Sequence, residues 1–197
     1  MKNRMALVMA SSRIYLFAAW AVAIASVPSF RSYQDQLDAG TDPKQIVTVY
    51  SSIKIMIFIS SLGAWIYTSA WLKAAVTDAN AAQPGSVRLQ RGWALWGWVV
   101  PIVSYWFPRM IIKDLLKTKP VEQVDKSINL NTWWLTWLMY ALIQSSAEAT
   151  QIINDYLGNK PVNPIHPEME IAGACLLTAS YFVWQKIVAA IGEPVAR

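Results

Sequence analysis

The stretch IMIFISSLGAWIYTSAWL, residues 55–72, decides which kind of fold this chain can form. It holds 18 consecutive residues without one charged side chain. A helix crosses the hydrocarbon core of a bilayer with roughly 20 apolar residues, because each residue advances it by about 1.5 Å. We therefore expect a membrane-spanning helix here, extending over residues 47–72.

Three further apolar runs are long enough to span a bilayer, over residues 13–31, 132–153 and 171–191. For the first run, a cleaved signal peptide is the alternative, because the letters AIAS end it in small residues. The composition favours a membrane protein: 55% of the residues are apolar and only 15% are charged, where a soluble domain carries roughly 25%. We expect an all-α integral membrane helical bundle with four transmembrane helices, forming a single domain over residues 1–197.

A fifth apolar run, residues 93–112, differs from the others. It contains Pro101 and Pro108, and basic residues flank it on both sides. Each proline removes a backbone donor and disrupts a regular helix. We expect a Pro-broken element here, either re-entrant or interfacial, rather than a fifth crossing.

The basic residues are unevenly distributed, and this predicts an orientation. Lys and Arg near the ends of spans favour the cytoplasmic side. If residues 93–112 do not cross, 13 of the 17 basic residues lie on one side: Lys2, Arg4, Arg13, Lys73, Arg88, Arg91, Arg109, Lys113, Lys117, Lys119, Lys126, Lys186 and Arg197. The opposite loops gather acidic residues: Asp35, Asp38, Asp42, Asp155, Glu168 and Glu170. We therefore expect both termini in the cytoplasm.

The central block carries a recognisable order of tryptophans and prolines. It reads WLKAAVTDANAAQPGSVRLQRGWALWGWVVPIVSYWFPRMIIKDLLKTKP and continues with NTWWLTWL. The ordered residues are Trp71, Asn80, Trp93, Gly97, Trp98, Pro101, Pro108, Asp114, Trp133 and Trp134. This order resembles a bacterial multi-pass membrane family known as domain of unknown function 4328, over roughly residues 71–137. Arg91 and Gly92 stand where that family usually has Pro or Ser. The resemblance implies a protein of the bacterial plasma (inner) membrane and implies no activity.

Polar side chains interrupt the span over residues 132–153. Gln144, Glu148 and Gln151 follow at i, i+4 and i+7, which makes one stripe on a helix. A carboxylate within the membrane costs free energy unless it has a partner, and Lys54 lies at a comparable depth in the second span. We expect an ion pair between Lys54 and Glu148, with a snorkelling Lys54 as the alternative. The stripe predicts either a proton or solute site or hydrogen bonding across helices.

A basic cluster follows the Pro-broken element. Arg109, Lys113 and Lys117 recur every four residues, so they share one helical face. Such a face attracts anionic lipid head groups, and simple topology signalling is the alternative. Asp114 and Asp125 are the expected local counter-charges. Binding of nucleic acid is not expected, because no nucleic-acid-binding motif occurs.

The remaining features predict packing rather than chemistry. The tryptophans of the central block are typical of an interfacial belt. Gly63 and Gly173 favour close approach of helices. Cys175 is expected to be a small buried side chain. His166 and Glu168 supply only two metal ligands, too few for a site, and no cofactor is expected.

No sequence motif assembles a nucleophile, a base and an oxyanion site, since GxSxG, HExxH and CxxC are all absent. The sequence therefore favours a non-catalytic membrane protein, an accessory or assembly subunit that packs against other membrane proteins or against itself. A small oligomeric transporter or channel-like protein with a site around Glu148 is the first alternative. A protein that binds anionic lipid through Arg109, Lys113 and Lys117 is the second.

Overall fold

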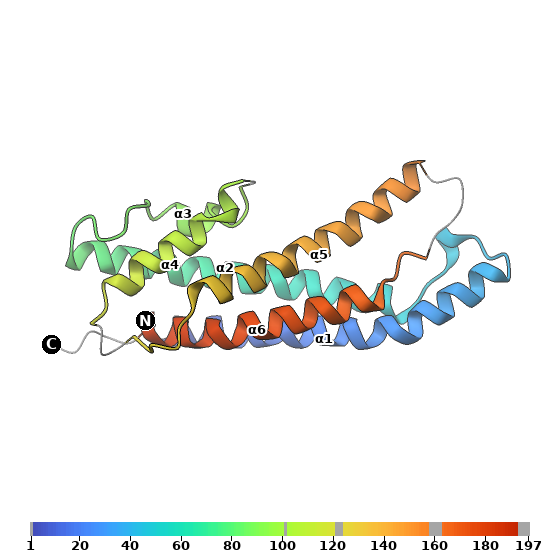
Figure 1. Cartoon of the computed structure of the whole chain (residues 1–197), viewed down its shortest axis with the longest axis horizontal. Coiled ribbons are helices and arrows are strands. Elements are labelled where there is room, and N and C mark those ends of the chain that lie inside the picture. The colour runs from blue at the N-terminus through green and yellow to red at the C-terminus, as the bar shows by residue number, and fades with distance from the viewer. Residues whose placement is uncertain (1, 101, 121–123, 158–162, 193–197) are drawn as a thin grey trace.

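The computed structural model describes residues 2–100, 102–120, 124–157 and 163–192, without the side chains of residues 147, 148 and 150–157. Every regular element within these ranges is helical (Figure 1). The elements are α1 (Lys2–Asp38), η1 (Pro43–Gln45), α2 (Val49–Ala82), α3 (Trp93–Trp96), η2 (Val103–Tyr105), α4 (Phe107–Lys117), α5 (Leu130–Leu157) and α6 (Pro167–Gly192). The fold is therefore all-α, as the sequence predicts.

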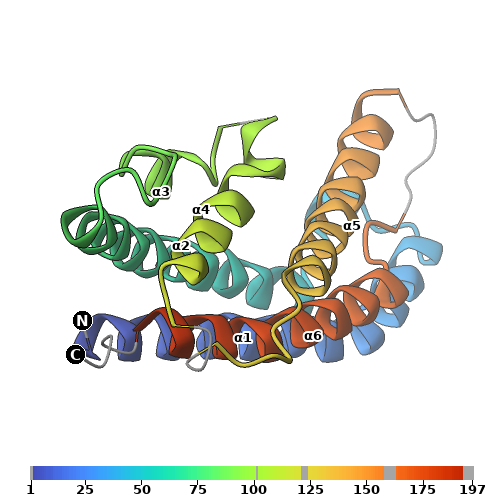
Figure 2. The ribbon, with the colours of Figure 1, turned by 60° about the vertical axis from the view of Figure 1, so that its left-hand side comes forward.

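The four long helices form an open layer rather than a closed bundle. α1 packs lengthwise against α2 and α6, and α6 packs against α5. α5 leaves the layer toward its C-terminal end, so it and α2 diverge on one side of the molecule (Figure 2). The short helices α3 and α4 lie over α2 at the end where α1 begins and α6 ends (Figure 1).

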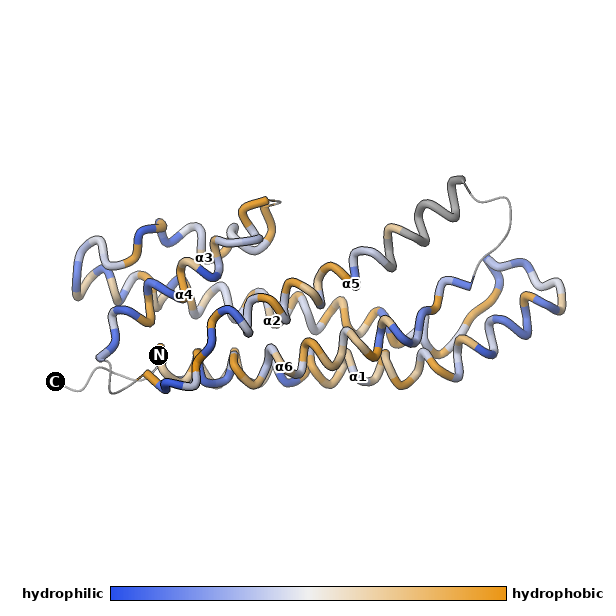
Figure 3. Tube along the Cα trace, in the orientation of Figure 1, coloured by the Kyte–Doolittle hydropathy of each residue, from blue (hydrophilic) through white to orange (hydrophobic). Residues whose placement is uncertain are grey.

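Three of the helices, α1, α2 and α6, are long and apolar enough to cross a membrane, counting the described residues. Their apolar residues follow the middle of each helix, while hydrophilic residues gather at the far end of α1 (Figure 3). This distribution matches the demand of a bilayer, whose hydrocarbon core accepts apolar side chains and a fully hydrogen-bonded backbone.

Two helices extend well past the spans that hydropathy marks. α1 continues to Asp38 because its far end packs: Tyr33 is buried in a small cluster with Ile46, Tyr50 and Ile165. α2 continues to Ala82, past a stretch that belongs to the main core: its Leu72, Ala75 and Val76 are buried in one cluster with Ile111 and Leu115 of α4. Tertiary packing, which hydropathy does not report, stabilises both extensions.

The start of α2 is fixed by a reciprocal cap. The Thr48 hydroxyl accepts a hydrogen bond from the backbone N–H of Ser51, and the Ser51 hydroxyl accepts one from the N–H of Thr48 at 3.1 Å. Two N–H groups that lack partners in the helix are thereby satisfied. The cap holds Tyr50, in the first turn of α2, against the first turn of α6.

Residues 93–112 do not form one continuous helix. The helices α3, η2 and α4 share this segment. Between them, Ile102 has a φ of 71°, a backbone conformation that a β-branched residue rarely adopts. Pro108 does not break a helix, contrary to the expectation: it lies in the first turn of α4, where a missing N–H costs no hydrogen bond. Pro101 lies outside the described residues.

The main hydrophobic core lies at the end that carries α3 and α4. Trp133 stacks on Trp184 at a centroid distance of 5.5 Å, and Trp71 meets Trp184 edge-on at 5.9 Å. Trp134 stacks on Trp137 at 4.9 Å. The expectation of an interfacial belt is therefore wrong for Trp133 and Trp134, because tertiary contacts bury both rings. Trp96 and Trp106 remain exposed.

Candidate functional site

A buried carboxyl group lies at the start of α6. Glu170 is only 5% exposed. Its Oε1 accepts a hydrogen bond from the Tyr50 hydroxyl of α2 at 2.6 Å, and its Oε2 accepts one from Gln144 Nε2 of α5 at 3.2 Å. Three helices thus converge on one carboxyl group.

Glu170 is not among the predicted site residues, because the charge pattern places it in an outer loop. α6 begins at Pro167, so Glu170 falls in its first turn, where the partial positive charge of a helix start favours an anion. One signal could have found it. Glu170 precedes the buried Gly173, Ala174 and Leu177 by three, four and seven residues, the spacing of one helical face.

The structure describes only part of the predicted polar stripe. Gln144 points from α5 to Glu170, across the site where Gly173 lacks a side chain: a Cβ on Gly173 would lie 3.1 Å from Gln144 Nε2. The side chains of Glu148 and Gln151 lie outside the described residues. Lys54 Nζ lies 5.4 Å from the ring centroid of Tyr50. The Lys54–Glu148 ion pair stays a prediction, and the structure places Lys54 beside the tyrosine that holds Glu170.

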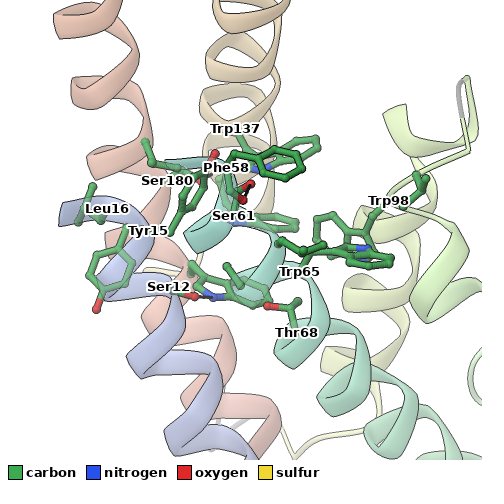
Figure 4. Close-up of a pocket in the computed structure, with 17 residues that line it drawn as sticks. Ser12, Tyr15, Leu16, Phe58, Ser61, Trp65, Thr68, Trp98, Trp137 and Ser180 are labelled. Carbon is green, nitrogen blue, oxygen red and sulfur yellow. Dashed lines mark hydrogen bonds between the residues drawn. The ribbon is translucent and has the colours of Figure 1, made fainter. Parts of the chain in front are cut away.

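A cavity of about 570 Å³ lies between the long helices (Figure 4). Its walls come from α1, α2, α5 and α6, with Trp98 and Val99 from the segment after α3. Eight aromatic residues line it: Tyr15, Phe58, Trp65, Trp98, Trp133, Trp137, Tyr181 and Trp184. This volume falls within the range of small-molecule sites, roughly 300–1,000 Å³.

The polar groups of the cavity wall are mostly hydrogen-bonded within the chain. The Ser180 hydroxyl donates to the Trp133 carbonyl at 3.3 Å, and Ser12 Oγ accepts from Trp184 Nε1 at 3.2 Å. The covered Nε1 of Trp65 has no hydrogen-bond partner among the described residues. The cavity is therefore apolar with isolated hydroxyl groups.

Two ion pairs bind the connecting segments outside the spans. Arg88 donates to the buried Asp114 from Nε and Nη2 on one edge of its guanidinium group, at 2.9 and 3.0 Å, and this raises the pKa of Arg88 above its usual value. Asp125 lies 3.4 Å from Lys186 Nζ. Hydrogen bonds from Ser127, together with that lysine, lower the pKa of Asp125. The two aspartates expected to balance the basic cluster thus pair with cations elsewhere.

The basic cluster lies on α4. Lys113 and Lys117 are exposed, while Ile112 and Asp114 face inward. Arg109 is committed to a hydrogen bond with Asn131 Oδ1. The helix places the three cations on one side, as their spacing predicts, and leaves the two lysines accessible.

The tryptophans and glycine of the central block hold α3 in place. Trp93 meets Phe107 edge-on at 4.8 Å, and a Cβ on Gly97 would lie 3.3 Å from the Cβ of Phe107. Trp98 Nε1 donates to the Ala94 carbonyl, and Trp134 Nε1 donates to the Tyr105 carbonyl at 2.8 Å. These residues are structural: they close the broken segment onto α4 and α5.

Cys175 is exposed on α6, which corrects the expectation that it is buried. His166 Nδ1 lies 3.6 Å from Glu168 Oε1. Within the described ranges, no three His, Cys, Asp or Glu residues come close enough to hold a metal ion.

Comparison with known proteins places the chain in a family. No curated protein and no solved structure matches it. A family model, "Domain of unknown function (DUF4328)", matches residues 38–159, beyond both ends of the block over residues 71–137 that carries the resemblance. The matched region begins at the end of α1 and includes α2, the broken segment and α5. Because this match covers more than half of the chain, the protein belongs to the DUF4328 family.

Proposed function

We propose that the protein is a non-catalytic, four-span protein of the bacterial plasma membrane, with both termini in the cytoplasm, that serves as an accessory or assembly subunit. α5 supplies the fourth span, since its 28 residues make a helix about 42 Å long, more than the roughly 30 Å of the hydrocarbon core. The basic residues near α4 and at the start of α1 support the orientation.

The observation that carries the proposal is an uncovered face of α2. Of the most apolar 18 residues in each helix, half are buried in α6 and a third in α1, but only 6% in α2. The Gly63 face, defined here as Ile59, Gly63, Ile66 and Tyr67, contains no residue that lines the cavity. Its three larger side chains are 42–62% exposed.

A comparison of the two membrane glycines supports a helix as the occupant of this face. A Cβ on Gly173 would lie 3.1–3.5 Å from Gln144 and Tyr140 of the neighbouring helix, whereas nothing lies within 4 Å of a Cβ on Gly63. Small residues in membrane helices permit close approach of another helix. Of these two glycines, Gly173 is the one used in that way among the described residues. The Gly63 face therefore suits a transmembrane helix from another protein.

The proposal is tested by purification of the tagged full-length protein in a mild detergent and quantification of co-purifying proteins by mass spectrometry. We expect another membrane protein at fixed stoichiometry. Gly63→Leu should abolish its recovery, because the added side chain blocks close approach. Cys175→Leu, the same kind of enlargement on the exposed side of α6, is the matched control. A homo-oligomer alone, or equal recovery with Gly63→Leu, would refute the proposal.

The Glu170 cluster favours a second candidate, a small oligomeric transporter or channel-like protein. A carboxyl group that is 5% exposed and bonded by Tyr50 and Gln144 is a typical element of a proton or ion path. Glu170→Gln keeps the shape of the side chain and removes its charge. In reconstituted vesicles, a transporter should lose proton or cation flux with this variant while its thermal unfolding stays cooperative. Flux equal to that of the unmodified protein would exclude Glu170 from such a path.

A further inference from the structure

The cavity lies at the depth of one leaflet of the bilayer. Ser12, Thr68 and Trp133 line it, and each lies near the end of an expected span, at residues 13, 72 and 132. Phe58 and Leu177 line its other end, closer to the middle of the membrane. The cavity thus runs from the polar boundary of the membrane, on the side of the N-terminus, into the hydrocarbon region.

The cavity opens toward the lipid between α2 and α5. Phe58 and Leu62 line it, and they are also 67% and 44% exposed, so they form its rim (Figure 4). α2 and α5 both line the cavity, and the two helices diverge (Figure 2). A molecule dissolved in the bilayer can therefore enter sideways, without crossing a polar surface.

The chemistry of the wall selects a hydrocarbon chain. Among the described residues, no charged side chain lines the cavity, and four hydroxyl-bearing residues other than tyrosine do. Three of those hydroxyl groups, on Ser12, Ser61 and Ser180, already take part in hydrogen bonds with the protein. Water needs two to four polar partners to stay in a cavity. An apolar chain needs none and gains dispersion contacts with the eight aromatic rings.

A cation lies next to this wall. Arg13 is exposed, and its Nε donates a hydrogen bond to the hydroxyl of Tyr181 at 2.9 Å. Tyr181 and Ser12, the residue before Arg13, both line the cavity. A guanidinium group has five N–H donors, and one is used here. The others suit a phosphate group, which arginine binds through two parallel hydrogen bonds.

We propose that the cavity binds one acyl chain of an anionic phospholipid from the leaflet on the side of the N-terminus, with the phosphate of that lipid held by Arg13. This site is separate from the basic face of α4 and from the Gly63 face. It holds whether or not the protein has a partner subunit.

The test is native mass spectrometry of the delipidated full-length protein, titrated with palmitoyl-oleoyl phosphatidylglycerol or with phosphatidylcholine bearing the same chains. We expect one tightly bound phosphatidylglycerol per chain, with a preference over phosphatidylcholine of about fivefold, the effect of one cation near an anionic head group. Arg13→Gln should remove that preference and leave the binding of phosphatidylcholine unchanged.

Variants that fill the cavity distinguish lipid bound there from lipid bound elsewhere on the protein. Ala64 lines the cavity, whereas the exposed Ala70 of the same helix does not. Ala64→Phe should weaken both lipids at least about tenfold, since the ring occupies the space of the chain. Ala70→Phe should match the unmodified protein. If Ala64→Phe elutes as an aggregate, Ser61→Leu fills the same space with a smaller group.

Three results would overturn the inference. The first is unchanged lipid binding in a folded cavity-filling variant. The second is equal affinity of the unmodified protein for the two lipids. The third is displacement of phosphatidylglycerol by the neutral quinone decylubiquinone at lower concentrations than phosphatidylcholine requires, which would identify an uncharged ring as the occupant.

Discussion

α6 and α2 are both apolar enough to cross a membrane, yet they are covered to very different extents. Half of the most apolar stretch of α6 is buried, against 6% for α2. α6 packs against both α1 and α5, whereas α2 packs mainly along α1. Hydropathy therefore shows only that the surroundings of a helix are apolar. Because lipid and a partner helix are equally apolar, only the packing contacts distinguish a helix face that is covered by protein from one that is not.

The largest loss of stability is expected for a substitution in the covered region around α6. Trp184 stacks on Trp133 and donates a hydrogen bond to Ser12. Trp184→Ala should lower the free energy of unfolding by about 3–5 kcal/mol, because it removes buried contacts and leaves a void. Phe58→Ala, on the exposed rim of α2, should change it by less than about 0.5 kcal/mol. Thermal unfolding in detergent measures both, and equal losses would refute the contrast.

Enlarging one glycine in each helix, Gly173 of α6 and Gly63 of α2, tests the difference between the two helices. Gly173→Leu should destabilise the isolated protein by about 1–3 kcal/mol, because the side chain would collide with Tyr140 and Gln144. Gly63→Leu should leave the stability of the isolated chain within about 0.5 kcal/mol, since it enters open space. Chemical denaturation of both variants tests this. A large loss with Gly63→Leu would show that α2 is covered within this chain.

A loss of similar size is expected at the first turn of α6. Tyr50→Phe removes the hydroxyl that donates to Glu170 at 2.6 Å and should cost about 1–3 kcal/mol, because a buried polar group loses a partner. Tyr67→Phe, at an exposed tyrosine of the same helix, is the control and should be neutral. Identical melting curves for Tyr50→Phe and the unmodified protein would remove Glu170 from the stabilising contacts.

The smallest effect is a dependence on pH at the covered end. The folded-state pKa of Asp125 lies below its ordinary value of 3.8, so its contribution to stability is present above that value and is lost as the pH falls through the lowered pKa. Between pH 5 and pH 3, the unmodified protein should therefore lose more stability than Asp125→Asn. Parallel pH profiles of the melting temperature would contradict this assignment.

Much of the fold follows from the sequence, for physical reasons. Long uncharged runs predict helices because a bilayer leaves no other way to satisfy the backbone. The pair Pro101 and Pro108 predicted an interrupted segment, and residues 93–112 indeed lack a continuous helix. Pro108 nevertheless lies in the first turn of α4, a position that only the local hydrogen bonding reveals.

The candidate site was only partly predictable. The i, i+4, i+7 spacing identified Gln144 as inward-facing, and it reaches Glu170. Glu170 itself was missed because a count of charges places acidic residues outside, whereas its position at the start of α6 depends on where that helix begins. The cavity was not predictable either, since it arises from the divergence of α5 from α2, two helices far apart in sequence.

The most direct test of the central claim is site-specific photo-crosslinking in the native membrane. A benzophenone-bearing residue replaces Ile59 on the Gly63 face or, as the control, the equally exposed Phe182 on α6. The account predicts one discrete adduct with a different membrane protein from position 59 and none from position 182. Adducts with lipid alone at both positions, or with a second copy of this chain, would contradict it.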